Sequence, residues 1–232
     1  MKKHIPNFLS LLNLASGFTS IIFILNGNIL ISVWILIGAL IFDFSDGLAA
    51  RLLNAYSELG KQLDSLADLV SFGVAPGLLM YHLMVDASGA DGVADIIVWT
   101  PVLIPVLSGL RLGIFNLDKE QTDSFRGLPT PANAMFIFSL ILASNYSDSQ
   151  MIANFVTSRW MLAFFTVSFS VLLVTRIPMF SFKFRNLRFK GNELRIVFIA
   201  SCILLFAGAG VAALPLIILL YLTVSITQSI IS

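Results

Sequence analysis

The chain has 232 residues, of which 57% are hydrophobic and only 12% are charged, and its formal net charge is +1. Soluble domains carry about 25% charged residues, so this composition excludes an ordinary water-soluble domain and predicts an integral membrane protein. The single cysteine, Cys202, excludes a disulfide bond within the chain.

Apolar stretches of about 20 residues, the length that crosses a bilayer as a helix, recur along the chain. The first contains Asn13 and Gly17 and has no small-residue cleavage site, so it predicts a membrane helix and not a signal peptide. Gly210 and Pro215 interrupt the last apolar region, which leaves open one kinked or re-entrant element in place of two spans. The eight predicted spans are 8–26, 29–54, 60–85, 95–116, 131–147, 155–176, 194–209 and 211–231.

These spans predict an all-α polytopic membrane protein in one domain, residues 1–232. Of the 14 lysine and arginine residues, Arg159 alone falls on one side of the eight spans, and the others fall on the side of the N-terminus. Basic residues concentrate on the cytoplasmic side of membrane proteins, so we expect a cytoplasmic N-terminus. The basic cluster at 183–192 is interpreted mainly as part of this signal and as a contact with anionic lipid.

Four aspartates lie near the connection between the second and third spans, in the pairs Asp43/Asp46 and Asp64/Asp68. Spacings of three and four residues put both members of a pair on one helix face. Carboxylates in or near hydrocarbon are costly and usually mark a function. We therefore expect the four side chains to converge on one pocket that opens to the cytosol.

Carboxylate oxygens suit hard divalent cations such as Mg²⁺ or Mn²⁺. His4 and His82 lie far along the chain from the acids, so zinc is not expected. Arg51 follows the first acid pair by about one turn, where a guanidinium can fork onto a phosphate group. The alternative is that the acids pair with Arg51 and Lys61 for structure alone, although acids outnumber bases in this stretch.

The segments DFSDGLAAR at 43–51 and GKQLDSLAD at 60–68 resemble the complete signature of the CDP-alcohol phosphatidyltransferases. Further segments resemble the branch of this family that uses serine: IPNFLSLLNLASG at 5–17, SFGVAPG at 71–77, RLGIFN at 111–116 and FRGLPTP at 125–131. The resemblance covers most of residues 5–135. It implies a catalytic core of six helices, about 5–176, followed by a helical pair, about 194–231.

The resemblance also implies an activity: the phosphatidyl group of CDP-diacylglycerol passes to the hydroxyl of L-serine, and CMP is released. The expected cofactor is a divalent metal, Mn²⁺ or Mg²⁺. The expected setting is a homodimer surrounded by lipid in the cytoplasmic (inner) membrane, with its active site facing the cytosol. No nucleic-acid partner is expected.

Residue roles follow from the same resemblance. It implies metal ligands at Asp43, Asp46, Asp64 and Asp68. Asp68 would also act as the general base. It implies contacts with CDP-diacylglycerol at Asn7, Gly47, Ala50, Arg51, Ser57 and Gly60. The candidate ligands of serine are Arg111, Asn116 and Arg126. The alternative role of the two arginines is to carry positive charge at a helix end. Gly113 and Ile114 depart from the family, where an alanine-arginine pair is expected, and this leaves the acceptor less defined.

Two other functions remain open from the sequence. A sister enzyme would use glycerol 3-phosphate or inositol as acceptor, and a phosphorylated acceptor would want a stronger basic cluster beside the acids. A cation or proton transporter would also carry intramembrane carboxylates. Transporters of that kind have related repeats in their two halves, whereas the second half of this chain carries almost no membrane acid.

Overall fold

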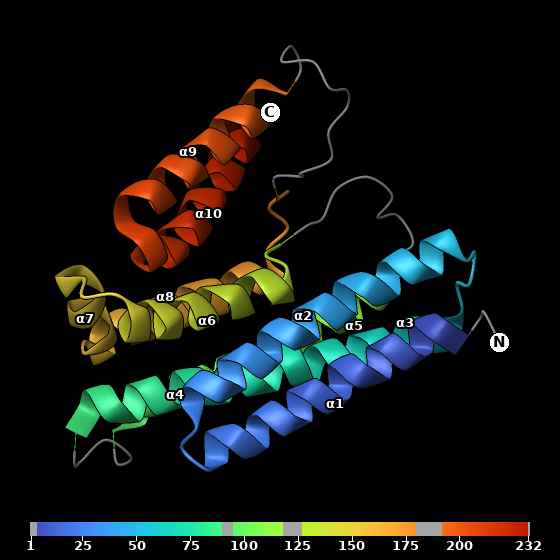
Figure 1. Cartoon of the computed structure of the whole chain (residues 1–232), viewed down its shortest axis with the longest axis horizontal. Helices are drawn as coiled ribbons and strands as arrows, with labels where there is room; N and C mark the ends of the chain where they lie inside the picture. Colours follow the sequence, from blue (N-terminus) through green and yellow to red (C-terminus); the bar gives the residue numbers. More distant parts are fainter. Residues whose placement is uncertain (1–3, 90–94, 118–126, 180–191, 232) are drawn as a thin grey trace.

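The computed structural model describes residues 4–89, 95–117, 127–179 and 192–231, and it is built from helices (Figure 1). The helices, in chain order, are α1 (Ile5–Leu25), α2 (Ile29–Leu52), α3 (Glu58–Asp68), the π-helix η2 (Leu69–Val74), α4 (Ala75–Ser88), the 3-10 helix η4 (Ile96–Val102), α5 (Leu103–Leu117), α6 (Thr130–Tyr146), α7 (Gln150–Val156), α8 (Arg159–Val174), α9 (Glu193–Ala209), the 3-10 turn η5 (Gly210–Ala212) and α10 (Ala213–Ile231).

The helices α1 and α2 form an antiparallel pair that lies along one side of the molecule (Figure 1). Pro6 occupies the first turn of α1, where a missing backbone N–H costs nothing. The connection between the two helices turns at Gly27, whose φ of 76° is a conformation that glycine adopts without strain. The short connection lets α2 return directly beside α1.

The third predicted span is divided into α3, η2 and α4, which follow one another without a loop. The π-helix begins directly after Asp68 and packs against α5. At Gly73 an added Cβ would lie 3.2 Å from Cβ of Ser108, so the absence of a side chain allows this close approach. The sequence did not predict the π-helix.

The helix α6 is the centre of the bundle, because 12 of its 17 residues are buried. Pro129 precedes the first residue of this helix and Pro131 lies in its first turn, close to the start of the span predicted at 131–147. An aromatic cluster packs α6 against α8, with the ring centroids of Phe136 and Phe169 4.4 Å apart. The helices α2, α4 and α10 also contact α6.

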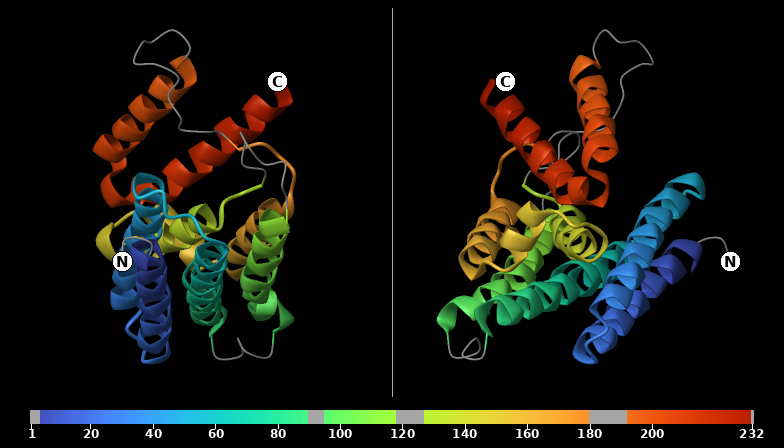
Figure 2. Two further views of the ribbon diagram at one scale, coloured as in Figure 1. Left: turned by 90° about the vertical axis from the view of Figure 1, so that its right-hand side faces the viewer. Right: turned by 60° about the vertical axis from the view of Figure 1, so that its left-hand side comes forward.

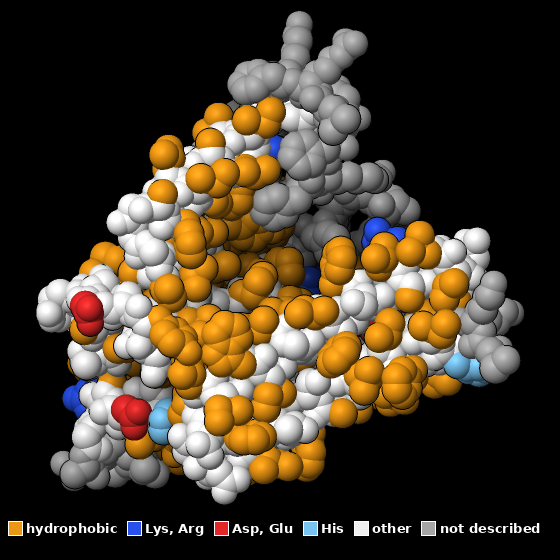
Figure 3. All heavy atoms as spheres, in the orientation of Figure 1, with side chains coloured by type: hydrophobic (Ala, Val, Ile, Leu, Met, Phe, Trp, Pro, Cys, Tyr) orange, Lys and Arg blue, Asp and Glu red, His pale blue; other side chains and the backbone are white. Residues whose placement is uncertain are grey.

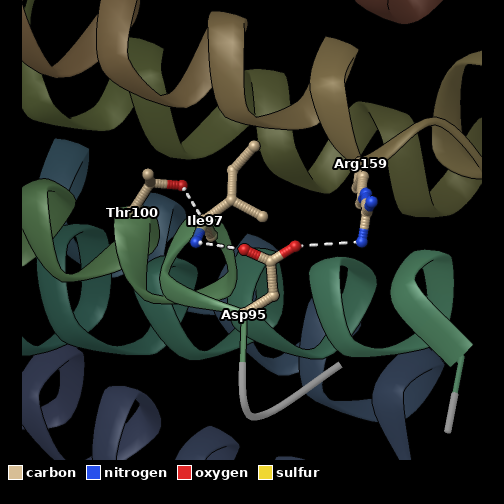
Figure 4. A network of polar contacts seen from close by, with 4 residues as sticks. All are labelled: Asp95, Ile97, Thr100 and Arg159. Carbon is tan, nitrogen blue, oxygen red and sulfur yellow. Dashed lines mark hydrogen bonds and ion pairs between the residues drawn. The ribbon is translucent and has the colours of Figure 1, made fainter. Parts of the chain in front are cut away.

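A polar network ties η4 to the start of α8 (Figure 4). Asp95 accepts a hydrogen bond from the backbone N–H of Ile97 at 3.1 Å, and its other oxygen lies 2.9 Å from Nη1 of Arg159. Thr100 Oγ1 donates to the carbonyl of Ile97 at 2.8 Å. The network lies beside a 79° bend between α7 and α8. The span predicted at 155–176 begins in the last residues of α7 and continues as α8 from Arg159.

The C-terminal helices α9 and α10 diverge from the turn at Gly210, and this turn lies against the other helices (Figure 2). Gly210 has a φ of 55°, which ends α9. The helix α10 contacts α6, whereas α9 buries only Phe198. The two C-terminal helices therefore differ in burial, since α10 packs on the bundle and α9 is largely exposed.

The prediction of an all-α polytopic membrane protein is confirmed. Hydrophobic side chains cover most of the face drawn in Figure 3, and charged ones are few. In the described parts of the chain, five helical segments are long and apolar enough to cross a membrane, and a sixth is added if α7 and α8 count as one. Each of the eight predicted spans corresponds to a helix, but the count of eight spans is not confirmed, because α6 is short and α9 and α10 form one apolar stretch.

Candidate active site

Three of the four aspartates lie close together, one in α2 and two in α3, and α1 packs against both helices. Asp43, Asp64 and Asp68 each present a carboxylate oxygen, and these oxygens all lie within 4.8 Å of one another. The i,i+4 spacing of Asp64 and Asp68 puts both on one face of α3, and Asp43 faces them from α2. We call these three residues the acidic cluster.

Asp46 belongs to the same region but is engaged differently. It is 7% exposed, and its Oδ2 accepts a hydrogen bond of 2.5 Å from Oγ of Ser10 in α1. All four aspartates line one cavity, which is the convergence that the spacing predicted. Asp46 is turned toward α1 within that arrangement.

The donor set of the acidic cluster fits a hard divalent cation. The cluster consists of carboxylates only, and Mg²⁺ and Mn²⁺ prefer oxygen ligands. Three carboxylates held this closely need a compensating positive charge, because each is buried or partly buried. Asp43, Asp64 and Asp68 are therefore the described residues that could hold a metal.

Two cavities meet at the acids. The first cavity, of about 560 Å³, lies among the start of α1, the end of α2 and the start of α3. The second cavity, of about 460 Å³, extends from the acids to α5 and the start of α6. Both are lined by Asp46, Gly47, Lys61 and Asp64, which form their common wall.

Five of the six residues expected to contact CDP-diacylglycerol line the first cavity: Asn7, Gly47, Ala50, Ser57 and Gly60. The sixth, Arg51, lines the second cavity. Ser57 also begins α3, since its Oγ accepts a hydrogen bond from the backbone N–H of Gly60 at 3.0 Å. At Gly60 an added Cβ would lie 2.9 Å from Oδ1 of Asn7, so this position is closely packed.

The second cavity contains two of the three candidate serine ligands, Arg111 and Asn116. Arg111 is 8% exposed and lies near Asp68, while its Nε has no hydrogen-bond partner. Asn116 donates from Nδ2 to Oγ of Ser65 at 2.9 Å. The third candidate, Arg126, lies outside the described residues.

Lys61 joins the two cavities on their common wall. Its Nζ donates to the backbone carbonyl of Asn116 at 2.9 Å, which links α3 to the end of α5. The sequence offered Lys61 only as a structural partner of the acids. No ion pair between Lys61 and an aspartate is found in the part of the chain that the structure describes.

The departure at Gly113 and Ile114 lies away from the second cavity. Its described lining includes Arg111, Leu112, Phe115 and Asn116 but neither of these two residues. Ile114 is 49% exposed, and an added Cβ at Gly113 would meet no atom within 4 Å. Neither position therefore contributes a side chain to the described lining of the second cavity.

Sequence reasoning missed the polar residues of α1 that contact the acids. Asn13 is fully buried and donates from Nδ2 to Oδ1 of Asp68 at 3.3 Å. Ser10 is 3% exposed and contacts Asp46. A signal was present, because Asn7, Ser10 and Asn13 recur every three residues in a mainly apolar helix.

Comparison with known proteins places this site in a family. The sequence model of the CDP-alcohol phosphatidyltransferases matches residues 3–177, which include the acidic cluster and both cavities. A CDP-diacylglycerol–serine O-phosphatidyltransferase of Mycobacterium leprae is 35% identical over 183 residues, covering 75% of this chain and 57% of the relative. The chain thus spans little more than half the length of that relative.

Two other relatives are matched over more of their length. A CDP-diacylglycerol–serine O-phosphatidyltransferase of Bacillus subtilis is 32% identical over 180 residues, covering 78% of this chain and 92% of the relative. An archaetidylserine synthase of Methanothermobacter thermautotrophicus is 33% identical over 175 residues, covering 75% of this chain and 68% of the relative. With most of its length matched and its acidic motif in place, this chain belongs to the CDP-alcohol phosphatidyltransferase family.

Proposed function

We propose that this protein transfers the phosphatidyl group of CDP-diacylglycerol to the hydroxyl of L-serine and releases phosphatidylserine and CMP. The observation that carries the proposal is the acidic cluster in the wall of the second cavity, where Asp64 also lines the first cavity. Family membership supports the reaction, and the names of the bacterial relatives support serine as acceptor. The transporter alternative has no support among the relatives described above.

The first cavity suits the CDP part of the donor. Gly47 leaves open space on its wall, and Asn7 offers a buried Oδ1 without a protein partner. Arg51 is exposed beside the acids, where its guanidinium can fork onto a phosphate. Asn7, Gly47, Ala50, Arg51, Ser57 and Gly60 are thus the proposed donor contacts.

The second cavity suits serine. A buried Arg111 with an unpartnered Nε can bind the serine carboxylate. Asn116 has an Oδ1 without a protein partner, and this oxygen can accept from the serine ammonium group. Arg126 remains a candidate from its sequence position alone.

The reaction is a displacement at phosphorus. Asp68 accepts the proton of the serine hydroxyl, and the oxygen attacks the phosphorus that carries the diacylglycerol as the bond to CMP breaks. A divalent ion, Mn²⁺ or Mg²⁺, held by Asp43, Asp64 and Asp68 with Asp46 beside them, would neutralise charge on the diphosphate. Holding both substrates in line supplies much of the remaining rate.

The proposed setting is the cytoplasmic membrane, with the N-terminus and the active site toward the cytosol and the protein as a homodimer. The distribution of basic residues supports this orientation. Arg159, the exception, pairs with Asp95. The dimer is proposed from the family resemblance alone.

The test compares acceptors. Purified protein in detergent is given CDP-diacylglycerol and Mn²⁺ with L-serine, glycerol 3-phosphate or inositol, and CMP and the lipid product are measured. We expect CMP release and phosphatidylserine with L-serine only. Equal or faster product formation with either other alcohol would assign a sister activity, and no CMP release with any of them would reject transferase function.

A further inference from the structure

The buried face of α1 is unusual for a helix in so hydrophobic a protein. It carries small and polar side chains, whereas Phe8, Leu11 and Phe18 of the same helix are exposed. In membrane proteins small and polar residues mark helix contacts, because they allow close approach and hydrogen bonds between helices. We call the polar part of this face, Ser10 and Asn13, the α1 stripe.

Each member of the α1 stripe contacts a different aspartate. Ser10 donates to Oδ2 of Asp46 in α2, and Asn13 donates to Oδ1 of Asp68 in α3. The helix α1 packs against both of these helices. The stripe therefore spans the two elements that supply the acids.

Asn13 is itself held in place. Ser71 Oγ in the π-helix donates to its backbone carbonyl at 3.0 Å, and Asn13 and Ser71 are both fully buried. Gly17, one turn further along α1, lets Ser71 approach, because an added Cβ there would meet the Ser71 backbone at 3.0 Å. The amide of Asn13 is thus fixed relative to Asp68 by its neighbours.

Hydrogen bonds to ligating carboxylates orient them and tune the affinity of a metal site. Asn13 donates to one carboxylate oxygen of Asp68, which is itself a member of the acidic cluster. We propose that Ser10 and Asn13 are positioning residues, which hold Asp46 and Asp68 and thereby set the affinity of the site for its divalent ion. This inference rests on the proposed function but concerns cation binding, which can be measured without substrates.

The experiment measures the Mn²⁺ concentration at the midpoint of thermal stabilisation for the purified protein, with no CDP-diacylglycerol or serine present. Loss of one such outer contact lowers metal affinity by about 10- to 100-fold, so Asn13→Leu and Ser10→Ala should raise the midpoint by about that factor. Ser10→Thr keeps the hydroxyl and should return the midpoint toward that of the unaltered protein.

The matched control is Ser20→Ala. Ser20 is fully buried on the same face of α1, its Oγ has no partner, and it lies about 10 Å along the helix from Asn13 at 1.5 Å per residue. If Ser10 and Asn13 only stabilise the fold, their variants should lower the unfolding temperature measured without Mn²⁺. Their Mn²⁺ midpoints should then equal that of Ser20→Ala. Midpoints of Asn13→Leu and Ser10→Ala equal to that of the control would overturn the inference.

A second readout separates the inference from the proposed function. At Mn²⁺ concentrations near the midpoint of the unaltered protein, both variants should lower kcat more than they change the KM for serine, and saturating Mn²⁺ should restore kcat. If the unaltered protein binds Mn²⁺ but transfers nothing to serine, the proposed function fails, while the midpoints still decide the role of the α1 stripe. If Asn13→Leu does not fold, Ser10→Ala and Ser10→Thr decide the inference.

Discussion

Asp68 accepts the proton of the serine hydroxyl in the proposed mechanism. The variant Asp68→Asn replaces its carboxylate by an amide of nearly the same shape. General-base catalysis contributes about 100- to 10,000-fold to a rate, so kcat should fall by at least about 100-fold while the protein stays folded. Steady-state CMP release and the unfolding temperature measure the two effects. Asp86→Asn is the control, because Asp86 pairs with His82 at 3.3 Å and lies outside both cavities.

An Asp68→Asn variant that kept most of its turnover would show that another group takes the proton. Loss of activity in Asp86→Asn of similar size would instead point to a general effect on the fold.

Arg111 is the proposed partner of the serine carboxylate. A hydrogen bond between charged groups contributes about 1.5–3 kcal/mol, so Arg111→Gln should raise the KM for serine by roughly 10- to 100-fold. The KM for CDP-diacylglycerol should change little, because the proposed donor contacts lie mainly in the first cavity. Initial-rate kinetics with each substrate varied in turn measure both constants.

Arg159→Gln provides the comparison for Arg111, since Arg159 pairs with Asp95 away from both cavities. A rise in both KM values on Arg111→Gln, or in neither, would contradict the assignment of Arg111 to serine.

The spacing of the four aspartates was enough to predict that each pair lies on one helix face. The convergence of the two pairs on one cavity followed only on the premise that these faces meet, which the shared cavity bears out. The contacts of Ser10 and Asn13 were not predictable in the same way. A single polar residue in an apolar stretch shows that it needs a partner, but the partner depends on how α1 rotates against α2 and α3. That rotation is a tertiary property, fixed by close contacts such as Gly17 on Ser71.

At the scale of the element, α2 offers a matched pair of glycines. An added Cβ meets no protein atom within 4 Å at Gly38 or at Gly47, and only Gly47 lines the cavities. Replacing a helical glycine by alanine stabilises a helix by about 0.5–1 kcal/mol, so both variants should be at least as stable as the unaltered protein. Gly47→Ala alone should raise the KM for CDP-diacylglycerol, which initial rates at saturating serine would measure.

Equal kinetics of Gly47→Ala and Gly38→Ala would mean that the donor does not approach α2 at this position. A drop in unfolding temperature confined to Gly47→Ala would mean that the added methyl group disturbs the protein itself.

Helix positions were predictable because apolar length and proline or glycine breaks determine where a span begins and ends. The breaks inside spans were not. The π-helix after Asp68 depends on the approach of α5 at Gly73, and the 79° bend before α8 lies beside the ion pair of Asp95 with Arg159. These partners are distant in sequence, so local patterns do not reveal them.

At the scale of the whole molecule, the proposed orientation can be tested with cysteine labelling. In a Cys202→Ser background, Tyr56→Cys adds a thiol to the connection between α2 and α3, and Gln150→Cys adds one at the start of α7; both positions are exposed. A membrane-impermeant maleimide should label Tyr56→Cys in inverted vesicles and Gln150→Cys in right-side-out vesicles. Mass shift on gels measures the labelling.

The reversed pattern would put the acidic cluster toward the opposite side of the membrane from the one proposed. Labelling of both thiols from one side would mean that the number of spans between them is even, and the predicted spans after α2 would need revision.

The common wall between the two cavities bears on stereochemistry. Donor and acceptor can be held at once on opposite sides of the carboxylates, so the lipid phosphate need not rest covalently on the protein between them. One in-line substitution inverts the configuration at phosphorus. Two successive substitutions through a protein-bound ester would instead retain the original configuration. A chiral phosphate label would therefore emerge in the product with inverted configuration.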